Sequence, residues 1–404
     1  MATVVLVGTL DTKGAEYAWL RERVRALGCD VVLVDTGIEA SDVEADVPAE
    51  RVAEAGGTSL GALRDAGDRG AAVTAMGEGA AAVLAGLDRV DAVLAVGGSG
   101  GSSIAARAVR DLPIGLPKLI VSTMASGDVT PYVGAKDVTL MYSVADIAGV
   151  NRVTRLVLGN AAAAAAGMAR AYEAARAAPP ADERPVVAAS MFGVTTPAVD
   201  AARERLEELG YEVLVFHATG AGGRALEGLV ESGLVEGVLD LTTTELADDL
   251  VGGVLSAGPE RLTAAGRRGV PQVVAPGALD MVNFGPRETV PERFEGRVLY
   301  VHNPTVTLMR TTPEEMAELG RRVAAKLAAA TGPAALFVPL GGVSALDAPG
   351  LPFHDPAADE ACFAAMAGAV AGAVETERLD VNINDPSFGR AMADRLHRMI
   401  SEGA

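Results

Sequence analysis

One pattern of strand, helix and strand occurs twice in the sequence, and it limits the fold more than any other feature. The first copy begins at Val4 and reads VVLVGTLDTKGAEYAWLRERVRALGCDVVLVDTG, and the second begins at Val186 and reads VVAASMFGVTTPAVDAARERLEELGYEVLVFHATG. They align without a gap at an offset of 182 residues, so that Gly28 falls on Gly210. Each copy has an apolar strand, a polar loop, an amphipathic helix that ends at a glycine suited to a left-handed C-cap, and a second apolar strand. The sequence therefore predicts a βαβ unit in each half of the chain.

Further apolar segments alternate with helical patterns in both halves. In the first half we expect strands at 92–96, 119–122 and 138–142, and in the second half at 238–241, 272–275, 298–302, 335–338 and 379–383. Strands that alternate with helices imply parallel sheets flanked by helices. The predicted fold class is α/β, with two doubly wound Rossmann-like domains and mainly parallel sheets.

A proline-rich segment separates the two halves. An alanine-rich helix expected at 160–178 runs into the sequence PPADERP, whose three prolines and charge cluster stop a helix. We therefore predict an N-terminal Rossmann-like nucleotide-binding domain at 1–178, a linker at 179–185 and a C-terminal Rossmann-like domain at 186–404. Residues 40–70 interrupt the first domain, and we expect either a solvated excursion with one short helix or a lid or dimer arm.

Charge and composition argue against several classes of partner. The formal net charge of −19 would repel a polyanion, and no stripe of lysine or arginine reverses it locally, so we expect no nucleic-acid partner. The longest apolar run, 361–374, is too short for a membrane span, so we expect no membrane partner. The N-terminus has no basic leader and the two cysteines suit reduced thiols, which together predict a cytoplasmic location.

A loop rich in glycine and serine, GGSGGSS, follows the third predicted strand. It is neither a Walker loop, because no GxxxxGK precedes a serine or threonine, nor a dinucleotide fingerprint, because a serine stands where the third glycine should fall. The glycines would let the backbone approach a phosphate or carboxylate closely, and the serines would donate hydroxyls at the start of the next helix. The alternative is that the glycines only permit a tight turn and close packing of helix on strand. The candidate residues are Gly97, Gly98, Ser99, Gly100, Gly101, Ser102 and Ser103.

Other loops are expected at the same edge of the sheet, because ligands of doubly wound sheets bind outside the carboxyl ends of the strands. These loops are GTLDTKG after the first strand, DTG at 35–37, and STMASGD after the fourth strand. Their candidate ligand-binding residues are Gly8, Thr9, Lys13, Ser122, Thr123, Ser126 and Gly127. Asp128 could hold Mg²⁺ beside bound phosphates, directly or through water, although such aspartates more often cap helices or turns.

Two histidines of the second half, His217 and His302, stand at the ends of predicted strands on what we expect to be one edge of the sheet. They could supply an acid or a base, with Arg224 and Arg310 as partners for an anion. The alternative is that each histidine is a hydrogen-bonded structural residue.

Taken together, the motifs resemble those of a known family. They include GTLDTKG, GGSGGSS, STMASGDV, YSVADIAGVN, MFGVTTP, FHATGAGGRALE, LDLTTTE, PGALDMVNFG and HNPTVTLMRTT. Over nearly its whole length the chain resembles the family related to the ATP-binding amino-terminal domain of the tomato mosaic virus resistance protein. The resemblance implies two Rossmann-like domains, ATP held by loops of the first, and assembly into a homodimer or a larger homo-oligomer.

The expected function is therefore an ATP-binding protein of unassigned activity, with a second ligand or substrate in the cleft between the domains. Two alternatives stay open. One is a lyase, isomerase or hydrolase that acts on a carboxylate or acyl substrate through His217 and His302. The other is a regulatory module that binds a partner.

Overall fold

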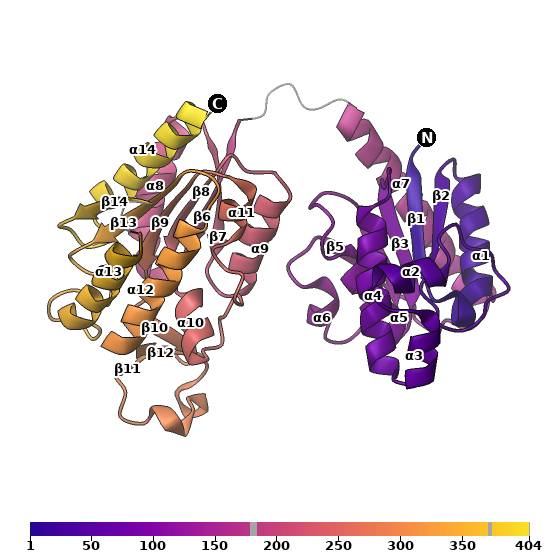
Figure 1. The fold of residues 1–404 in the computed structure, drawn as a ribbon, viewed down its shortest axis with the longest axis horizontal. Helices are drawn as coiled ribbons and strands as arrows, with labels where there is room; N and C mark the ends of the chain where they lie inside the picture. Colours follow the sequence, from indigo (N-terminus) through magenta and orange to yellow (C-terminus); the bar gives the residue numbers. More distant parts are fainter. Residues whose placement is uncertain (178–183, 371–373, 404) are drawn as a thin grey trace. The chain divides into compact units, whose positions relative to one another are not determined.

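The chain folds into two compact units, Met1–Ala181 and Asp182–Ala404 (Figure 1). The structure, a computed structural model, describes residues 1–177, 184–370 and 374–403, so most of the predicted linker at 179–185 lies outside the described residues. Each unit contains a parallel sheet with helices packed on it. The predicted class of two Rossmann-like α/β domains is therefore confirmed.

The first unit is built on a five-stranded parallel sheet with the strand order β2-β1-β3-β4-β5. Its strands are β1 (Thr3–Gly8), β2 (Asp30–Asp35), β3 (Ala92–Gly97), β4 (Lys118–Ser122) and β5 (Val138–Tyr142). Its helices are α1 (Leu10–Ala26), α2 (Ala49–Ala55), α3 (Leu60–Ala66), α4 (Arg69–Ala85), α5 (Ser99–Val109), α6 (Thr130–Val133) and α7 (Arg152–Ala177).

Helices cover both faces of this sheet. Val5 and Val7 of β1 pack in a core with residues of α2, α4 and α5, whereas Val4 and Leu6 face a second core formed with α1 and α7. Strands buried on both faces must be apolar at every position, which explains the unbroken apolar runs of β1 and β3.

The order of the strands fixes where a ligand would bind. β2 lies on one side of β1 and β3 on the other, so the chain reverses its direction of winding between β1 and β3. At such a switch point the loops that leave the two strands diverge and open a crevice at their carboxyl ends.

The second unit has two sheets. The larger is parallel, with the order β14-β13-β9-β8-β6-β7, and the smaller is antiparallel, with the order β10-β12-β11. The strands are β6 (Val186–Met191), β7 (Glu212–His217), β8 (Gly237–Thr242), β9 (Gln272–Gly277), β10 (Met281–Phe284), β11 (Leu299–Asn303), β12 (Val306–Arg310), β13 (Ala334–Pro339) and β14 (Glu375–Leu379). The α-helices are α8 (Thr196–Glu208), α9 (Ala221–Glu231), α10 (Glu245–Val251), α11 (Ala264–Arg268), α12 (Pro313–Ala328), α13 (Pro356–Val370) and α14 (Pro386–Gly403).

Three expectations from the sequence are corrected by the structure. The strand expected at 298–302 is β11, but it pairs antiparallel with β12 and belongs to the small sheet. The strand expected at 379–383 ends at Leu379, because the next residues turn and Asn382 donates to the carbonyls of Gly341 and Asp347. Residues 40–70 contain two short helices, α2 and α3, rather than the one short helix expected of a solvated excursion.

Candidate functional site

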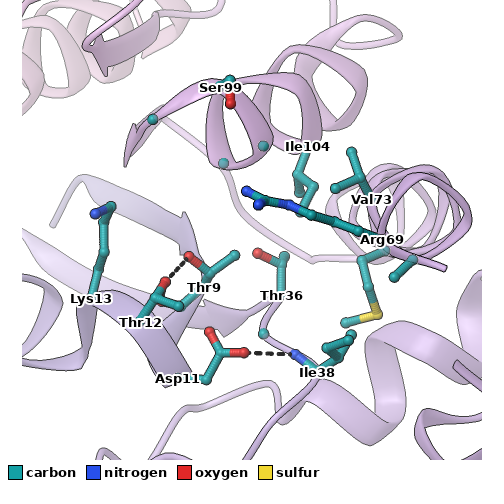
Figure 2. Close-up of a pocket in the computed structure, with 16 residues that line it drawn as sticks. Thr9, Asp11, Thr12, Lys13, Thr36, Ile38, Arg69, Val73, Ser99 and Ile104 are labelled. Carbon is teal, nitrogen blue, oxygen red and sulfur yellow. Dashed lines mark hydrogen bonds between the residues drawn. The ribbon is translucent and has the colours of Figure 1, made fainter. Parts of the chain in front are cut away.

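A cavity of about 470 Å³ opens at the carboxyl ends of β1, β2 and β3, at the switch point of the first sheet (Figure 2). The loops after these strands form its polar wall, and α4 and α5 contribute an apolar wall. The residues that line it are Thr9, Asp11, Thr12, Lys13, Thr36, Gly37, Ile38, Arg69, Ala72, Val73, Met76, Gly98, Ser99, Gly100, Gly101 and Ile104. A polar wall facing an apolar one suits a ligand with a charged end and a flat or apolar end.

The N-terminus of α5 opens on this cavity. Gly98 is the N-cap, and its carbonyl accepts the first intrahelical hydrogen bond, from the amide of Ser102 at 2.9 Å. The amides of the three residues between them therefore have no intrahelical partner, as at any helix start. Two of these three residues and the N-cap are glycine, so they have no side chains of their own to cover the amides. Such a terminus attracts an anion through its free N–H groups and the helix dipole.

The glycines of this loop have different roles. A Cβ on Gly97 would lie 2.8 Å from the Cα of Gly101, so this glycine is needed for α5 to pack on the end of β3. A Cβ on Gly98 would lie 3.7 Å from the Oγ1 of Thr123, and one on Gly100 would lie 3.5 Å from a guanidinium nitrogen of Arg69. These are ordinary contacts. Close packing therefore explains Gly97, whereas the packing of the chain itself does not require a glycine at Gly98 or Gly100.

Two cations lie at the cavity. Lys13 lines it from α1, and its Nζ donates to the carbonyl of Ile147 at 2.7 Å. The backbone of Lys13 is not helical, with φ −135° and ψ 28°, so α1 is kinked at this residue. Arg69, the first residue of α4, extends across the cavity toward α5 in Figure 2. Within the described residues Arg69 forms neither an ion pair nor a hydrogen bond, so its guanidinium is available to a ligand.

The wall formed by the β1 and β2 loops contains unsatisfied oxygen atoms. The Oδ2 of Asp11 accepts from the amides of Ile38 and Glu39 at 3.0 and 3.1 Å. The Oδ1 of Asp11 and the hydroxyl of Thr36 are inaccessible to solvent and have no hydrogen-bond partner within the described residues. Gly37 lies directly against Asp11, since a Cβ there would be 2.6 Å from the carboxyl carbon. A buried polar atom without a partner is unfavourable unless a ligand or water satisfies it.

Several residues that the sequence nominated lie outside the cavity lining. Ser102 and Ser122 are buried, and their hydroxyls are 2.6 Å apart, so each satisfies the other and joins α5 to β4. The hydroxyl of Ser103 donates to the carbonyl of Ser99 within the helix. Gly8 makes room for the ring of Tyr17, because a Cβ there would lie 1.9 Å from it.

The loop after β4 is turned to solvent. Ser126 and Gly127 are exposed, and the Oδ1 of Asp128 accepts from the amide of Thr130 at 3.0 Å. Hydrogen bonds from Thr130 lower the pKa of Asp128. Within the described residues, no group of three or more His, Cys, Asp or Glu side chains could hold a metal ion. A magnesium ion would therefore depend on phosphate oxygens of the ligand for much of its coordination.

The expectation that His217 and His302 share one edge is wrong. His217 ends β7 at the edge of the large sheet, whereas His302 lies in β11 at the edge of the small antiparallel sheet. Arg224 donates to the carbonyl of Ser256 at 2.9 Å. Arg310 is buried and pairs with Asp359 at 2.7 Å.

Among the cavity residues that the sequence-based candidates lacked are Asp11, Thr36 and Arg69. The first two stand in the quoted loops GTLDTKG and DTG, so their place at the carboxyl ends of β1 and β2 was a usable signal. Arg69 gave no such signal, because it begins a helix in the segment for which the sequence predicted little order.

A second cavity, of about 440 Å³, lies beyond the carboxyl end of β13 and includes His354 and Asp359 in its wall. Beneath it are carboxyl groups with little access to solvent. Burial raises the pKa of Asp280 to about 7, and burial together with the nearby charge of Asp347 raises that of Asp359. Burial also raises the pKa of Asp248, in α10, to about 7. Each of these carboxyl groups therefore keeps its proton to a higher pH in the folded unit than in the unfolded chain.

We expect the second unit to lose stability as the pH rises from 5 to 8. Its buried carboxyls bind protons in the folded state up to a pH of about 7, whereas in the unfolded chain they release them near pH 4. The contribution of these protonated carboxyls to the free energy of unfolding is therefore complete below pH 4. It is lost as the pH rises through the pKa of the folded state, and each group lowers the free energy of unfolding by at most about 1.4 kcal/mol per pH unit.

Urea unfolding at several pH values, followed by circular dichroism, measures this slope. The single tryptophan, Trp19, lies in the first unit, so its fluorescence separates the two transitions. Asp280→Asn should flatten the slope of the second unit. A stability of this unit that rises steadily from pH 5 to 8 would contradict the expectation.

The fold and the cavity define an α/β protein of two Rossmann-like units, with a candidate small-molecule site at the switch point of the first sheet. The chain belongs to the uncharacterised protein family UPF0261: the model of its N-terminal domain matches residues 2–174, and that of its C-terminal domain matches residues 184–400. The resemblance stated from the sequence motifs is thus confirmed. None of the described helices is long and apolar enough to cross a membrane.

Relatives of the chain include bacterial and plant proteins. A UPF0261 protein of Clostridium tetani is 48% identical over 99% of both chains, and one of Rhizobium meliloti is 50% identical over 97% of both. The tomato protein "ToMV resistance protein Tm-1(GCR237)" is 40% identical over 97% of this chain, which spans 55% of the tomato protein. Among solved structures, spinosyn rhamnosyltransferase SpnG matches at 14% identity over 99% of this chain and 97% of its own, with a TM-score of 0.17.

Proposed function

We propose that the first unit binds ATP, with the phosphates at the N-terminus of α5 and the nucleoside between the β2 loop and the apolar wall. The observation that carries the proposal is the uncovered helix start at Gly98–Gly101, which opens on a cavity at the switch point of the sheet. Free helix amides at this place are suited to phosphate groups.

The charges of the cavity support the same assignment. Arg69 has no partner among the described residues and can pair with a phosphate through its planar fork of donors. The Nζ of Lys13 now donates to the carbonyl of Ile147. If it donated to a phosphate oxygen instead, the phosphates would have a second cation as a partner. The side chains of Val73, Met76 and Ile104 offer an apolar surface for a base.

Arg69→Ala should weaken ATP binding by about tenfold to a hundredfold, since a charge-assisted hydrogen bond contributes about 1.5–3 kcal/mol. Calorimetric titration of ATP with Mg²⁺ into the full chain measures the effect. The variant should fold normally, because Arg69 is exposed.

Arg25→Ala is the matched control, since Arg25 is an exposed arginine in the last turn of α1, far along the helix from its cavity end. Its affinity for ATP should equal that of the wild type. If the wild-type protein shows neither heat of binding nor a rise in melting temperature with millimolar ATP, the proposed function is wrong.

The remaining expectations belong to the same proposal. They are a location in the cytoplasm, assembly into a homodimer or a larger homo-oligomer, and a second small-molecule ligand. The separate positions of His217 and His302 give no support to an enzyme that uses both histidines at one centre.

A further inference from the structure

The part of the cavity wall opposite the start of α5 carries two oxygen atoms without partners. The Oδ1 of Asp11 is inaccessible to solvent although the same carboxylate uses its Oδ2 for two backbone amides. The hydroxyl of Thr36, a residue 2% exposed, also lacks a partner. Both residues line the cavity (Figure 2).

These two atoms differ in what they can bind. A carboxylate oxygen only accepts, so the free oxygen of Asp11 needs a donor such as a hydroxyl. The Thr36 hydroxyl can donate and accept, and a single rotatable bond directs it, so it can turn to a ligand without movement of the backbone. The neighbouring Gly37 keeps the backbone against Asp11, and the amides of Ile38 and Glu39 fix the orientation of the carboxylate.

The location narrows the chemistry of the ligand. Asp11 and Thr36 lie at the ends of β1 and β2, to the side of the α5 amides and the Arg69 guanidinium. A ligand whose phosphates lie at the α5 amides and the Arg69 guanidinium would present its sugar toward the β2 loop. Two oxygen atoms of the same cavity wall that lack partners match the vicinal hydroxyls of a ribose.

We propose that Asp11 and Thr36 form a ribose subsite that selects ribonucleotides over deoxyribonucleotides. This inference rests on the proposed function, because it assumes that a nucleotide occupies the cavity. Because neither oxygen is accessible to solvent, each side chain must turn slightly toward the ligand as it binds. Asp11 then accepts a hydrogen bond from one hydroxyl, and Thr36 exchanges a hydrogen bond with the same or the adjacent hydroxyl. Loss of a hydroxyl leaves a buried oxygen of the protein unsatisfied again, which is the origin of the selectivity.

The test compares ATP, 2′-deoxy-ATP and 3′-deoxy-ATP by calorimetric titration into the full chain, with and without Mg²⁺. We expect at least one deoxynucleotide to bind about tenfold to a hundredfold more weakly than ATP. Asp11→Asn and Thr36→Val keep the shape of each side chain. In these variants the dissociation constants of the deoxynucleotide and of ATP should differ by only a fewfold. Thr74→Val is the matched control, because Thr74 lies on α4 outside the cavity lining and donates to the carbonyl of Gly70.

The outcomes separate this inference from the proposed function. If wild-type protein binds all three nucleotides with equal affinity, the ribose subsite is wrong and ATP binding stands. If none binds, both proposals are wrong. If Asp11→Asn weakens all three equally, and only when Mg²⁺ is present, Asp11 holds a metal ion and the ribose assignment is overturned.

Discussion

Gly100→Val is expected to weaken ATP binding by at least about a hundredfold while the first unit stays folded. Gly100 lies in the first turn of α5 and lines the cavity, and its φ is not positive, so the backbone accepts a side chain. A Cβ there makes only ordinary contacts, 3.5 Å from Arg69 and 3.7 Å from Val73. The methyl groups of valine would extend further, into the space beside the α5 amides, where a phosphate must make direct contact.

Two variants separate loss of the site from loss of the fold. Gly100→Ala adds only the Cβ and should bind ATP with an affinity between those of the wild type and Gly100→Val. Gly167→Val makes the same change in α7, where nothing lies within 4 Å of an added Cβ, and should bind ATP normally. Calorimetry, circular dichroism and Trp19 fluorescence measure binding and folding together. If folded Gly100→Val binds ATP like the wild type, the loop is only a turn.

The repeated βαβ pattern predicted much of the fold because its signals are local. Gly28 and Gly210, which the alignment placed together, have φ of +81° and +94° and follow the ends of α1 and α8. The strands of parallel sheets are apolar at every position because both faces are buried, so they stand out in the sequence. Both signals depend on neighbouring residues alone.

The parts that the sequence did not predict depend on distant residues or on very short elements. α2 and α3 have seven residues each, too few for a helical periodicity to be recognised. β10 has four residues, all of them buried, and its partner β12 lies beyond more than twenty further residues of chain. Pairing at that separation leaves no local pattern in the sequence.

The candidate site was predicted in part for the same reasons. The glycine loop follows a strand and opens a helix, a context that the sequence shows, and Gly98–Gly101 do line the cavity. In the sequence, however, a serine that binds a ligand cannot be told from one that binds another serine, and Ser102 and Ser122 are of the second kind. Arg69 reaches the site only because α4 begins beside α5, which the tertiary structure alone reveals.

In the second unit, the corresponding switch point, between β6 and β8, is occupied by the protein's own side chains. Helix α10 takes the place that α5 has in the first unit, and it begins with Glu245 rather than with serine and glycine. The carboxylate of Glu245 accepts from the amides of Gly220 and Gly223 at the start of α9, at 2.6 and 3.0 Å. A carboxylate of the chain thus takes the place of an anionic ligand, which explains why we assign nucleotide binding to the first unit alone.

Arg261→Met is expected to destabilise the second unit by about 3–5 kcal/mol, because it removes the cation that pairs with a buried group of carboxylates. Arg261 is fully buried. Its guanidinium donates to Asp240 through both Nη atoms, at 2.5 and 2.6 Å, and to Glu245 through Nε at 2.6 Å. It also pairs with Glu227 at 3.2 Å. Methionine fills similar volume but leaves these carboxylates without a counter-charge.

Urea unfolding followed by circular dichroism measures this loss, and Trp19 fluorescence reports whether the first unit is affected. Arg267→Met is the matched control, because Arg267 is 51% exposed and pairs with Glu231 at 2.7 Å and Glu260 at 2.5 Å. Exposed pairs of this kind contribute about 1 kcal/mol or less. We expect the tryptophan transition and ATP binding to be the same in both variants as in the wild type, because Arg261 supports only the second unit. If Arg261→Met lowers the free energy of unfolding of the second unit by less than about 1 kcal/mol, the carboxylates are protonated or bind other partners when the arginine is absent.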